Sequence, residues 1–271
     1  MNILTKTLAA VGLGLLAQLP ANAAIVSTWG YDVETLWTSA TPAGVPPNGV
    51  AISGDQKTLS WGDANTANRS SLAISTDPIG TVNTFVGLGL PGPGFIAAGS
   101  ALTHHNNPVA GTTLESAMLQ STLNLFASGT DGSGAGTGPG SIVLNILFNE
   151  TPNSAPCTVS SPTPCNDIFV LTTPLQNQSF DWDGTTYFVN LFPTNGALAF
   201  LTDAACASVG ITTGTSGQRC VGFTTPENQD TTLAFGFTIS TRPLSIPEPN
   251  VLALAGLAFL AAAWARKQRK S

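Results

Sequence analysis

Two adjacent histidines, His104 and His105, are the side chains of this sequence best suited to proton transfer or metal binding. Histidine titrates near neutral pH, and its ring nitrogen is a common metal ligand. If residues 102–108 form a strand, the two rings point to opposite faces and cannot readily share one ion. If they form a turn, as the Asn-Asn-Pro sequence favours, one ring could ligate a metal or act as a general base. We favour the structural alternative, a histidine hydrogen-bonded to backbone that holds a loop.

Four polar residues could meet this histidine segment in space: Glu150, Asn153, Asn166 and Asp167. Their oxygens are ligands of the kind that Ca²⁺ takes in proteins. Such side chains can also replace backbone hydrogen bonds where long loops cross a sheet, and loop Asn and Asp are most often turn residues. We therefore expect a structural role, with no cofactor and no metal ligand, and keep Ca²⁺ binding as the alternative.

No catalytic signature accompanies these residues. The sequence lacks a G-x-S-x-G elbow, an H-E-x-x-H helix and a lone cysteine nucleophile. The glycine-rich residues 129–140 lack the GK[ST] ending of a phosphate-binding loop, and residues 181–184 (DWDG) lack the third acid and later Glu of a calcium loop. The sequence predicts no catalytic residue and a non-enzymatic protein; a hydrolase that uses His104 is the less favoured alternative.

Cysteine number and spacing predict disulfides. The four cysteines are Cys157, Cys165, Cys206 and Cys220. An even number in an oxidising compartment indicates two bridges, for which three connectivities exist. Short loops close at a lower entropy cost, which favours Cys157–Cys165 and Cys206–Cys220. A zinc site would require closer pairs or nearby histidines.

The net charge of the body indicates which classes of molecule it could bind. Between residues 25 and 246, four bases face fourteen acids, a formal charge of −10. Nucleic-acid binding is excluded because phosphate contacts need clustered Lys or Arg. A cationic partner, a divalent ion or a neutral glycan remains. Trp29, Trp37, Trp61 and Trp182 could stack on sugars, although burial in a core is the commoner fate of tryptophan.

The N-terminus, residues 1–23, has the pattern of a secretory signal peptide. Lys6 precedes an apolar run over residues 8–19, and Ala21 and Ala23 supply the small residues that signal peptidase requires. We expect export through the Sec translocon and cleavage after Ala23.

The C-terminus, residues 247–271, predicts a transient anchor in the inner membrane. Its apolar segment, residues 251–265, makes a helix about 22 Å long at ~1.5 Å per residue, which is short of the ~20 residues that a bilayer core needs. Basic residues after the segment hold that end in the cytoplasm and leave the body outside. The motif before the segment is Pro247, Glu248 and Pro249, and the basic residues after it are Arg266, Lys267, Arg269 and Lys270.

The body between these ends, residues 24–246, is predicted to be one all-β domain. Ile142, Leu144, Ile146 and Phe148 alternate as the core face of a strand does. No βαβ rhythm occurs, so an antiparallel sandwich or jelly roll is expected. Short β-like runs cover residues 24–29, 49–53, 58–61, 70–75, 81–87, 119–127, 142–148, 167–172, 179–182, 185–190, 197–201 and 232–240.

The C-terminal tail resembles the PEP-CTERM domain of Gram-negative bacteria that make exopolysaccharide. The resemblance rests on the Pro-Glu-Pro motif at residues 247–249, the apolar helix and the Arg/Lys end. It implies cleavage near the motif by a membrane-embedded exosortase, followed by release or transfer to the cell surface.

The body resembles the THxN subgroup of PEP-CTERM proteins. The motif is Thr103, His104 and Asn106, with His105 at the variable position. The resemblance implies that His104 and Asn106 matter more than His105, and it implies no activity, because none is established for the subgroup. Further blocks that carry it lie at residues 59–62, 70–72, 150–153, 164–169 and 225–227.

These observations predict an exported surface or extracellular-matrix protein, sorted through its tail and associated with exopolysaccharide or biofilm. A carbohydrate- or calcium-binding module is the alternative, and a secreted hydrolase is less favoured.

Overall fold

The computed structural model describes residues 24–244, except 45–48, 64–67, 76, 128–135, 158, 160, 162–164, 174, 196–197 and 213–219. The expected signal peptide and sorting tail lie outside the described residues. Within them, no helix has both the length and the apolar character needed to cross a membrane.

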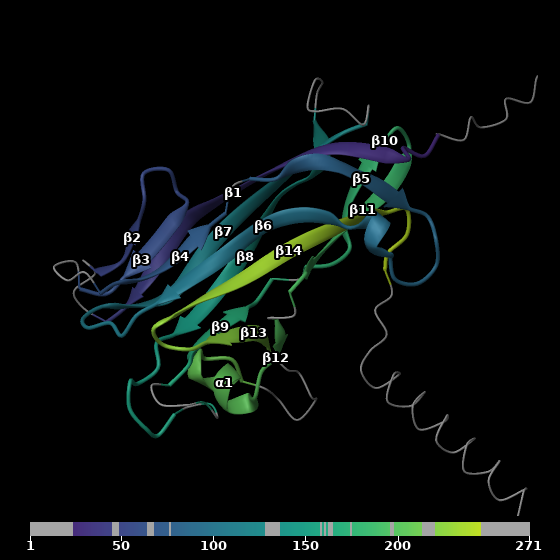
Figure 1. The fold of residues 1–271 in the computed structure, drawn as a ribbon. Helices are drawn as coiled ribbons and strands as arrows, with labels where there is room; N and C mark the ends of the chain where they lie inside the picture. The colour runs from purple at the N-terminus through teal and green to yellow at the C-terminus, as the bar shows by residue number, and fades with distance from the viewer. Residues whose placement is uncertain are drawn as a thin grey trace, which may run out of the picture.

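The body folds into two β layers that face each other, which confirms the predicted all-β class (Figure 1). The first layer runs in the order β12 (Ala199–Phe200), β13 (Val221–Thr225), β9 (Asp167–Leu171), β8 (Thr137–Asn149), β7 (Thr113–Phe126), β1 (Thr28–Ala43) and β5 (Ile79–Phe85). The second runs β10 (Gln178–Trp182), β11 (Thr185–Pro193), β14 (Gln229–Ser240), β6 (Ala97–Asn106), β4 (Ser70–Ile74), β3 (Thr58–Trp61) and β2 (Ala51–Ile52).

A short parallel contact between β5 and β14 joins the two layers, and the other pairings are antiparallel. A 3₁₀ turn, η2 (Pro93–Phe95), precedes β6, and α1 (Asp203–Ser208) lies close to the first layer. The sandwich is therefore one continuous hydrogen-bonded system with a shared interior.

Alternating apolar residues build that interior. The face of β8 predicted from Ile142, Leu144, Ile146 and Phe148 is buried, and it meets residues of the second layer such as Leu233 in one cluster. β9 is buried on both faces, since Ile168 and Val170 pack in a separate cluster with residues of α1. Because β9 is covered on both sides, its first residue, Asp167, is also buried in the protein interior.

Several strands differ from their prediction: β13 was not expected, β7 begins six residues earlier than expected, and β1 and β6 differ most. β1 spans 16 residues where only residues 24–29 were expected. The apolar alternation of β1 is interrupted because the polar Thr35 occupies a core position. Its Oγ1 lies 2.9 Å from Ser100 Oγ and 3.1 Å from Ser121 Oγ. β6 was considered as a turn, yet it is a strand up to Asn106, because its many small residues fit between β4 and β14.

Two local predictions are confirmed. The hairpin β10–β11 turns at Asp183 and Gly184, whose φ angles of 46° and 75° are the positive values that a type I′ turn requires. The disulfides are the two local ones, Cys157–Cys165 and Cys206–Cys220.

Candidate functional site

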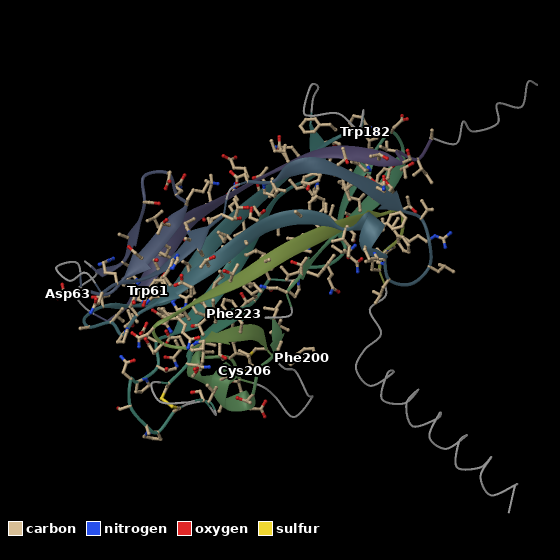
Figure 2. The ribbon with its side chains drawn as sticks, in the orientation of Figure 1. Trp61, Asp63, Trp182, Phe200, Cys206 and Phe223 are labelled. Atoms are coloured by element: carbon tan, nitrogen blue, oxygen red, sulfur yellow. A yellow bond between two sulfur atoms is a disulfide. The ribbon has the colours of Figure 1, made fainter. Side chains whose placement is uncertain are left out.

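Five strands bring polar residues to one end of the sandwich. Asn149, the last residue of β8, pairs with Ile168, and Asp167, the first residue of β9, pairs with Thr225. Asn106, the last residue of β6, pairs with Gln229 of β14. Figure 2 shows this end through Trp61, with Trp182 at the opposite end of the molecule. The antiparallel register thus collects residues that are far apart in the sequence.

His104 lies in the interior at this end and is 0% exposed. Its ring stacks on Trp61 with 5.3 Å between centroids and meets the edge of Phe169. Nδ1 lies 2.8 Å from Thr225 Oγ1, whereas Nε2 has no partner among the described residues. Burial, reinforced by the neighbouring His105, lowers the pKa of His104 to about 3, so the ring is neutral at physiological pH.

His105 points to the opposite face, as a strand requires, and pairs with the exposed Asp230 at 2.7 Å. Thr103 shares this outer face, where its hydroxyl lies 3.0 Å from that of Thr232. Of the three motif residues, only His104 and Asn106 therefore converge inside the molecule.

Asn106 is buried beside His104. Its Nδ2 donates to the Thr225 carbonyl at 3.2 Å, and its Oδ1 has no partner in the part of the chain that the structure describes. The side chain also interacts with the Asp167 carboxylate. Asn106 thus connects the histidine motif to the acidic residues.

Three carboxyl groups, which we call the acidic cluster, gather next to this motif: Glu150, Asp167 and Glu227. One oxygen of each lies within 4.8 Å of those of the other two. Trp61 Nε1 donates to Glu150 Oε2 at 3.0 Å, and the Thr151 N–H donates to Asp167 Oδ1 at 2.9 Å. The remaining oxygens, Glu150 Oε1, Asp167 Oδ2 and both of Glu227, have no partner among the described residues.

The cluster carries no compensating positive charge in the described parts of the chain. Two pairs of a basic and an acidic side chain occur there, Lys57–Asp77 and His105–Asp230, and neither includes a member of the acidic cluster. Burial, strengthened by the nearby Asp167, raises the pKa of Glu150. Burial likewise raises the pKa of Asp167, against the opposing hydrogen bond from Thr151, and that of Glu227. The site therefore disfavours three free carboxylates.

Thr151 holds two members of the cluster together. Its hydroxyl lies 3.0 Å from the Cys165 carbonyl and 3.1 Å from that of Asn166, so the two ends of the β8–β9 connection meet. The Cys157–Cys165 disulfide closes part of the same connection. Glu150 and Asp167 are thereby held close, and the described residues between them form neither helix nor strand.

The sequence prediction of this site was partly right. Glu150 and Asp167 do meet the motif, whereas Asn153 is exposed and Asn166 is half-buried near Thr224. Glu227 was missed as a site residue, although a Pro-Glu-Asn turn signal marks its position. Only the pairing of β13 with β9 shows that this turn lies over Asp167.

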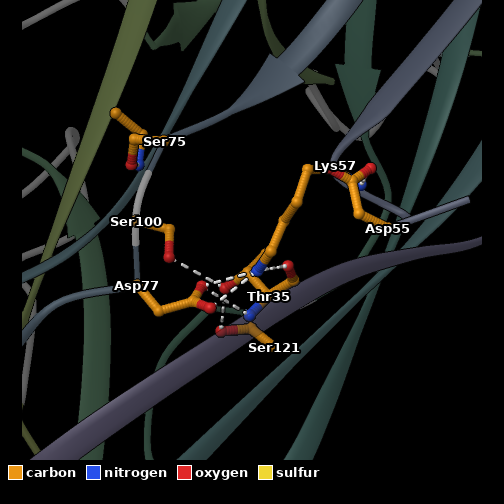
Figure 3. A network of polar contacts seen from close by, with 8 residues as sticks. Thr35, Asp55, Lys57, Ser75, Asp77, Ser100 and Ser121 are labelled. Carbon is orange, nitrogen blue, oxygen red and sulfur yellow. Dashed lines mark hydrogen bonds and ion pairs between the residues drawn. The ribbon is translucent and has the colours of Figure 1, made fainter. Parts of the chain in front are cut away.

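A second polar cluster lies around Lys57 and is complete within itself (Figure 3). Lys57 Nζ donates to Asp77 Oδ2 at 2.7 Å and to the Thr35 carbonyl at 2.7 Å. Asp77 Oδ1 accepts from the Thr35 N–H at 3.1 Å. Asp55, also drawn in Figure 3, accepts from the Ser53 hydroxyl and the Lys57 N–H. Each charged group of this cluster thus has a partner within the chain, and a structural role accounts for the cluster.

The tryptophans do not form the sugar-stacking surface considered from the sequence. Trp29, Trp37 and Trp61 are each 0% exposed, so their faces belong to the core. Trp182 is half-buried and lies edge-on to Trp29, with 6.2 Å between the ring centroids. Packing of large apolar rings explains all four positions.

Comparison with protein families identifies the tail. Residues 245–267 match the PEP-CTERM protein-sorting motif. The chain carries a PEP-CTERM sorting signal. The match contains the predicted motif residues 247–249, together with Arg266 and Lys267, whereas Arg269 and Lys270 follow it. No curated protein matched the chain.

This sorting signal marks an exported protein of Gram-negative bacteria that is sorted to the cell surface by an exosortase. The match covers the tail alone, so the assignment of the body to the THxN subgroup stays a prediction. Ala21 and Ala23, the expected signal-cleavage residues, lie outside the described residues, and their role stays a prediction as well.

Proposed function

We propose that this PEP-CTERM protein is a non-enzymatic component of the cell surface or extracellular matrix, associated with exopolysaccharide. Residues 1–23 direct it through the Sec translocon and are removed by signal peptidase. The segment 251–265 then anchors the precursor in the inner membrane until the exosortase cleaves near residues 247–249. The observation that carries the proposal is the sorting signal at residues 245–267 attached to a strongly acidic all-β body.

Two features of the body support a non-enzymatic role. His104, the strongest candidate for acid–base catalysis, is enclosed by aromatic rings and its pKa of about 3 lies far from the pH at which a general base works best. His105 is accessible, but it pairs with the exposed Asp230, and no serine, threonine or cysteine of the described residues is seen bonded to its ring. A separate observation supports the exported location: both disulfides are of the kind that persists in an oxidising exterior.

Processing is tested with the full chain in a Gram-negative host that has an exosortase. The triple variant Pro247→Ala, Glu248→Ala, Pro249→Ala is expected to remain as a precursor in the membrane fraction, while the wild type reaches the surface in shortened form. The single variant Pro243→Ala, which lies just outside the matched residues, is the control and should be processed normally.

The same strains test the association with exopolysaccharide. In a mutant that makes no exopolysaccharide, we expect the processed protein to pass from the cell surface into the medium. Equal retention on cells with and without exopolysaccharide would contradict the association. Wild-type chain that is never shortened would contradict the processing route.

A further inference from the structure

We propose that the acidic cluster binds one Ca²⁺ ion, which ties the β8–β9 connection to the β13–β14 turn. The ligands are carboxylate oxygens of Glu150, Asp167 and Glu227, joined by the amide oxygen of Asn106. This inference goes beyond the proposed function, because the ion would be part of the body whatever route the tail follows.

The first argument is the charge that the fold encloses. Asp167 is 0% exposed and Glu227 is 6% exposed, and both lie within 4.8 Å of a Glu150 oxygen. A carboxylate removed from water is costly unless it is paired, hydrogen-bonded or bound to a metal. In the described part of the chain, Lys57 is engaged by Asp77, and Arg69 donates to the carbonyls of residues 49 and 62.

The second argument is independent of the acids and comes from Asn106. This side chain is 2% exposed, yet its Oδ1 has no partner among the described residues. The Thr225 carbonyl can only accept a hydrogen bond, so it fixes Nδ2 on its own side and leaves Oδ1 free. The N–H side of the same amide interacts with Asp167, so Asn106 adjoins the acidic cluster, and its unpartnered Oδ1 is a neutral oxygen ligand buried beside it.

The donor chemistry selects the ion. Carboxylate and amide oxygens are hard ligands that suit Ca²⁺ or Mg²⁺, whereas a zinc site would draw on nitrogen or sulfur. The carboxylate ligand oxygens all lie within 4.8 Å of one another and come from separate segments of the fold. Such an irregular set of side chains suits the flexible geometry of Ca²⁺ better than the near-ideal octahedron that Mg²⁺ demands.

Position within the fold indicates what the ion would do. Its ligands come from the end of β6, the residue after β8, the start of β9 and the turn that enters β14. One ion would therefore join both layers of the sandwich at a place where strand pairing ends. We expect a structural ion that stabilises the exported body, in the weak affinity range typical of extracellular calcium modules, a Kd of about 10⁻⁴ to 10⁻³ M.

The test uses the processed protein purified from the cell surface and stripped of metal with a chelator. Calorimetric titration with CaCl₂ should show one site per chain, and thermal unfolding should occur at higher temperature with Ca²⁺ than without it. The variants Glu227→Gln and Asp167→Asn should weaken Ca²⁺ binding at least tenfold. The control Asp230→Asn removes an acid only three positions from Glu227, exposed and outside the cluster, and should bind as the wild type does.

A measurement on the unaltered chain covers the case in which a variant fails to fold. Trp61 bonds directly to Glu150, so excitation of tryptophan should sensitise luminescence of Tb³⁺ bound in the cluster, and Ca²⁺ should quench it by displacement. Absence of Ca²⁺-dependent heat, unfolding shift and Tb³⁺ luminescence would overturn the proposal. So would binding that is equal in folded Glu227→Gln and Asp167→Asn variants, or tighter binding of Mg²⁺ than of Ca²⁺.

Discussion

The Lys57 cluster, which is partly exposed, and the acidic cluster, which is largely buried, belong to the same sandwich, but they balance their charge differently. Around Lys57, one ammonium faces one carboxylate, and backbone groups of Thr35 occupy further hydrogen-bonding positions. At the other site, three carboxyl groups share one buried end with a neutral histidine. Only in the Lys57 cluster do groups of the chain itself balance the charge.

The difference indicates where a ligand belongs. Polar groups that the chain satisfies internally need no further explanation, since hydrogen bonding repays their burial. In the acidic cluster the same fold leaves oxygens of all three acids without partners among the described residues. Because both clusters belong to one molecule, substitutions of the same chemical kind can be compared between them directly.

The largest expected effect on stability comes from His104, whose ring packs against Trp61 and Phe169 next to the acidic cluster. His104→Ala removes a ring packed against Trp61 and Phe169 and a hydrogen bond to Thr225, and it should lower the free energy of unfolding by about 3 kcal/mol. Chemical denaturation measures this change. The matched control, His105→Ala, removes only an exposed pair with Asp230 and should cost less than ~1 kcal/mol.

Equal losses from the two histidine variants would contradict this account. They would mean that the packing of the His104 ring contributes no more to stability than the exposed hydrogen bond between His105 and Asp230. The adjacent positions make the comparison sharp, because the two substitutions alter the same strand.

Sequence reasoning predicted the parts of this site that depend on local pattern. The alternation in residues 142–148 gave β8, and hence the position of Glu150 directly after it. The separation of His104 from His105 follows from strand geometry alone, once the segment is known to be a strand. The sequence alone did not decide whether this segment is a strand or a turn, because the small residues of β6 have little preference for strands.

The convergence itself depends on long-range pairing, which a single sequence does not encode locally. Glu227 reaches Asp167 because β13 pairs with β9 in one particular register, with Thr225 opposite Asp167. A shift of one residue would reverse the faces of β13. The length of β1 was missed for a local reason. Thr35 is a polar residue at a core position, and it breaks the apolar alternation by which a strand is predicted.

A smaller effect is expected in the Lys57 cluster. Asp77→Asn keeps the shape of the side chain but removes the charge that faces Lys57, and it should destabilise the fold by about 1 kcal/mol. The pair is partly exposed, with side-chain exposures of 26% and 34%, so solvent screening limits the loss. Thermal unfolding in the presence of a chelator checks this value. No change, or an increase in stability, would show that the pair is not a closed structural unit.

The same carboxylate-to-amide change should have the opposite sign at Glu227. In a chelator, Glu227→Gln relieves the burial of an unpaired acid and should stabilise the fold by roughly 0.5 kcal/mol, because folding already disfavours its charged form, as the raised pKa indicates.

With saturating Ca²⁺ the order should reverse, because the wild type gains binding free energy that the variant lacks. Paired unfolding curves of wild type, Glu227→Gln and Asp77→Asn, each with Ca²⁺ and with chelator, measure both signs. Destabilisation by Glu227→Gln of equal size in the two conditions would show that its carboxylate has an internal partner, and the contrast between the clusters would then fail. Reversal confined to Glu227→Gln would locate the dependence on Ca²⁺ in the acidic cluster, since Asp77→Asn controls for the loss of one negative charge elsewhere in the same body.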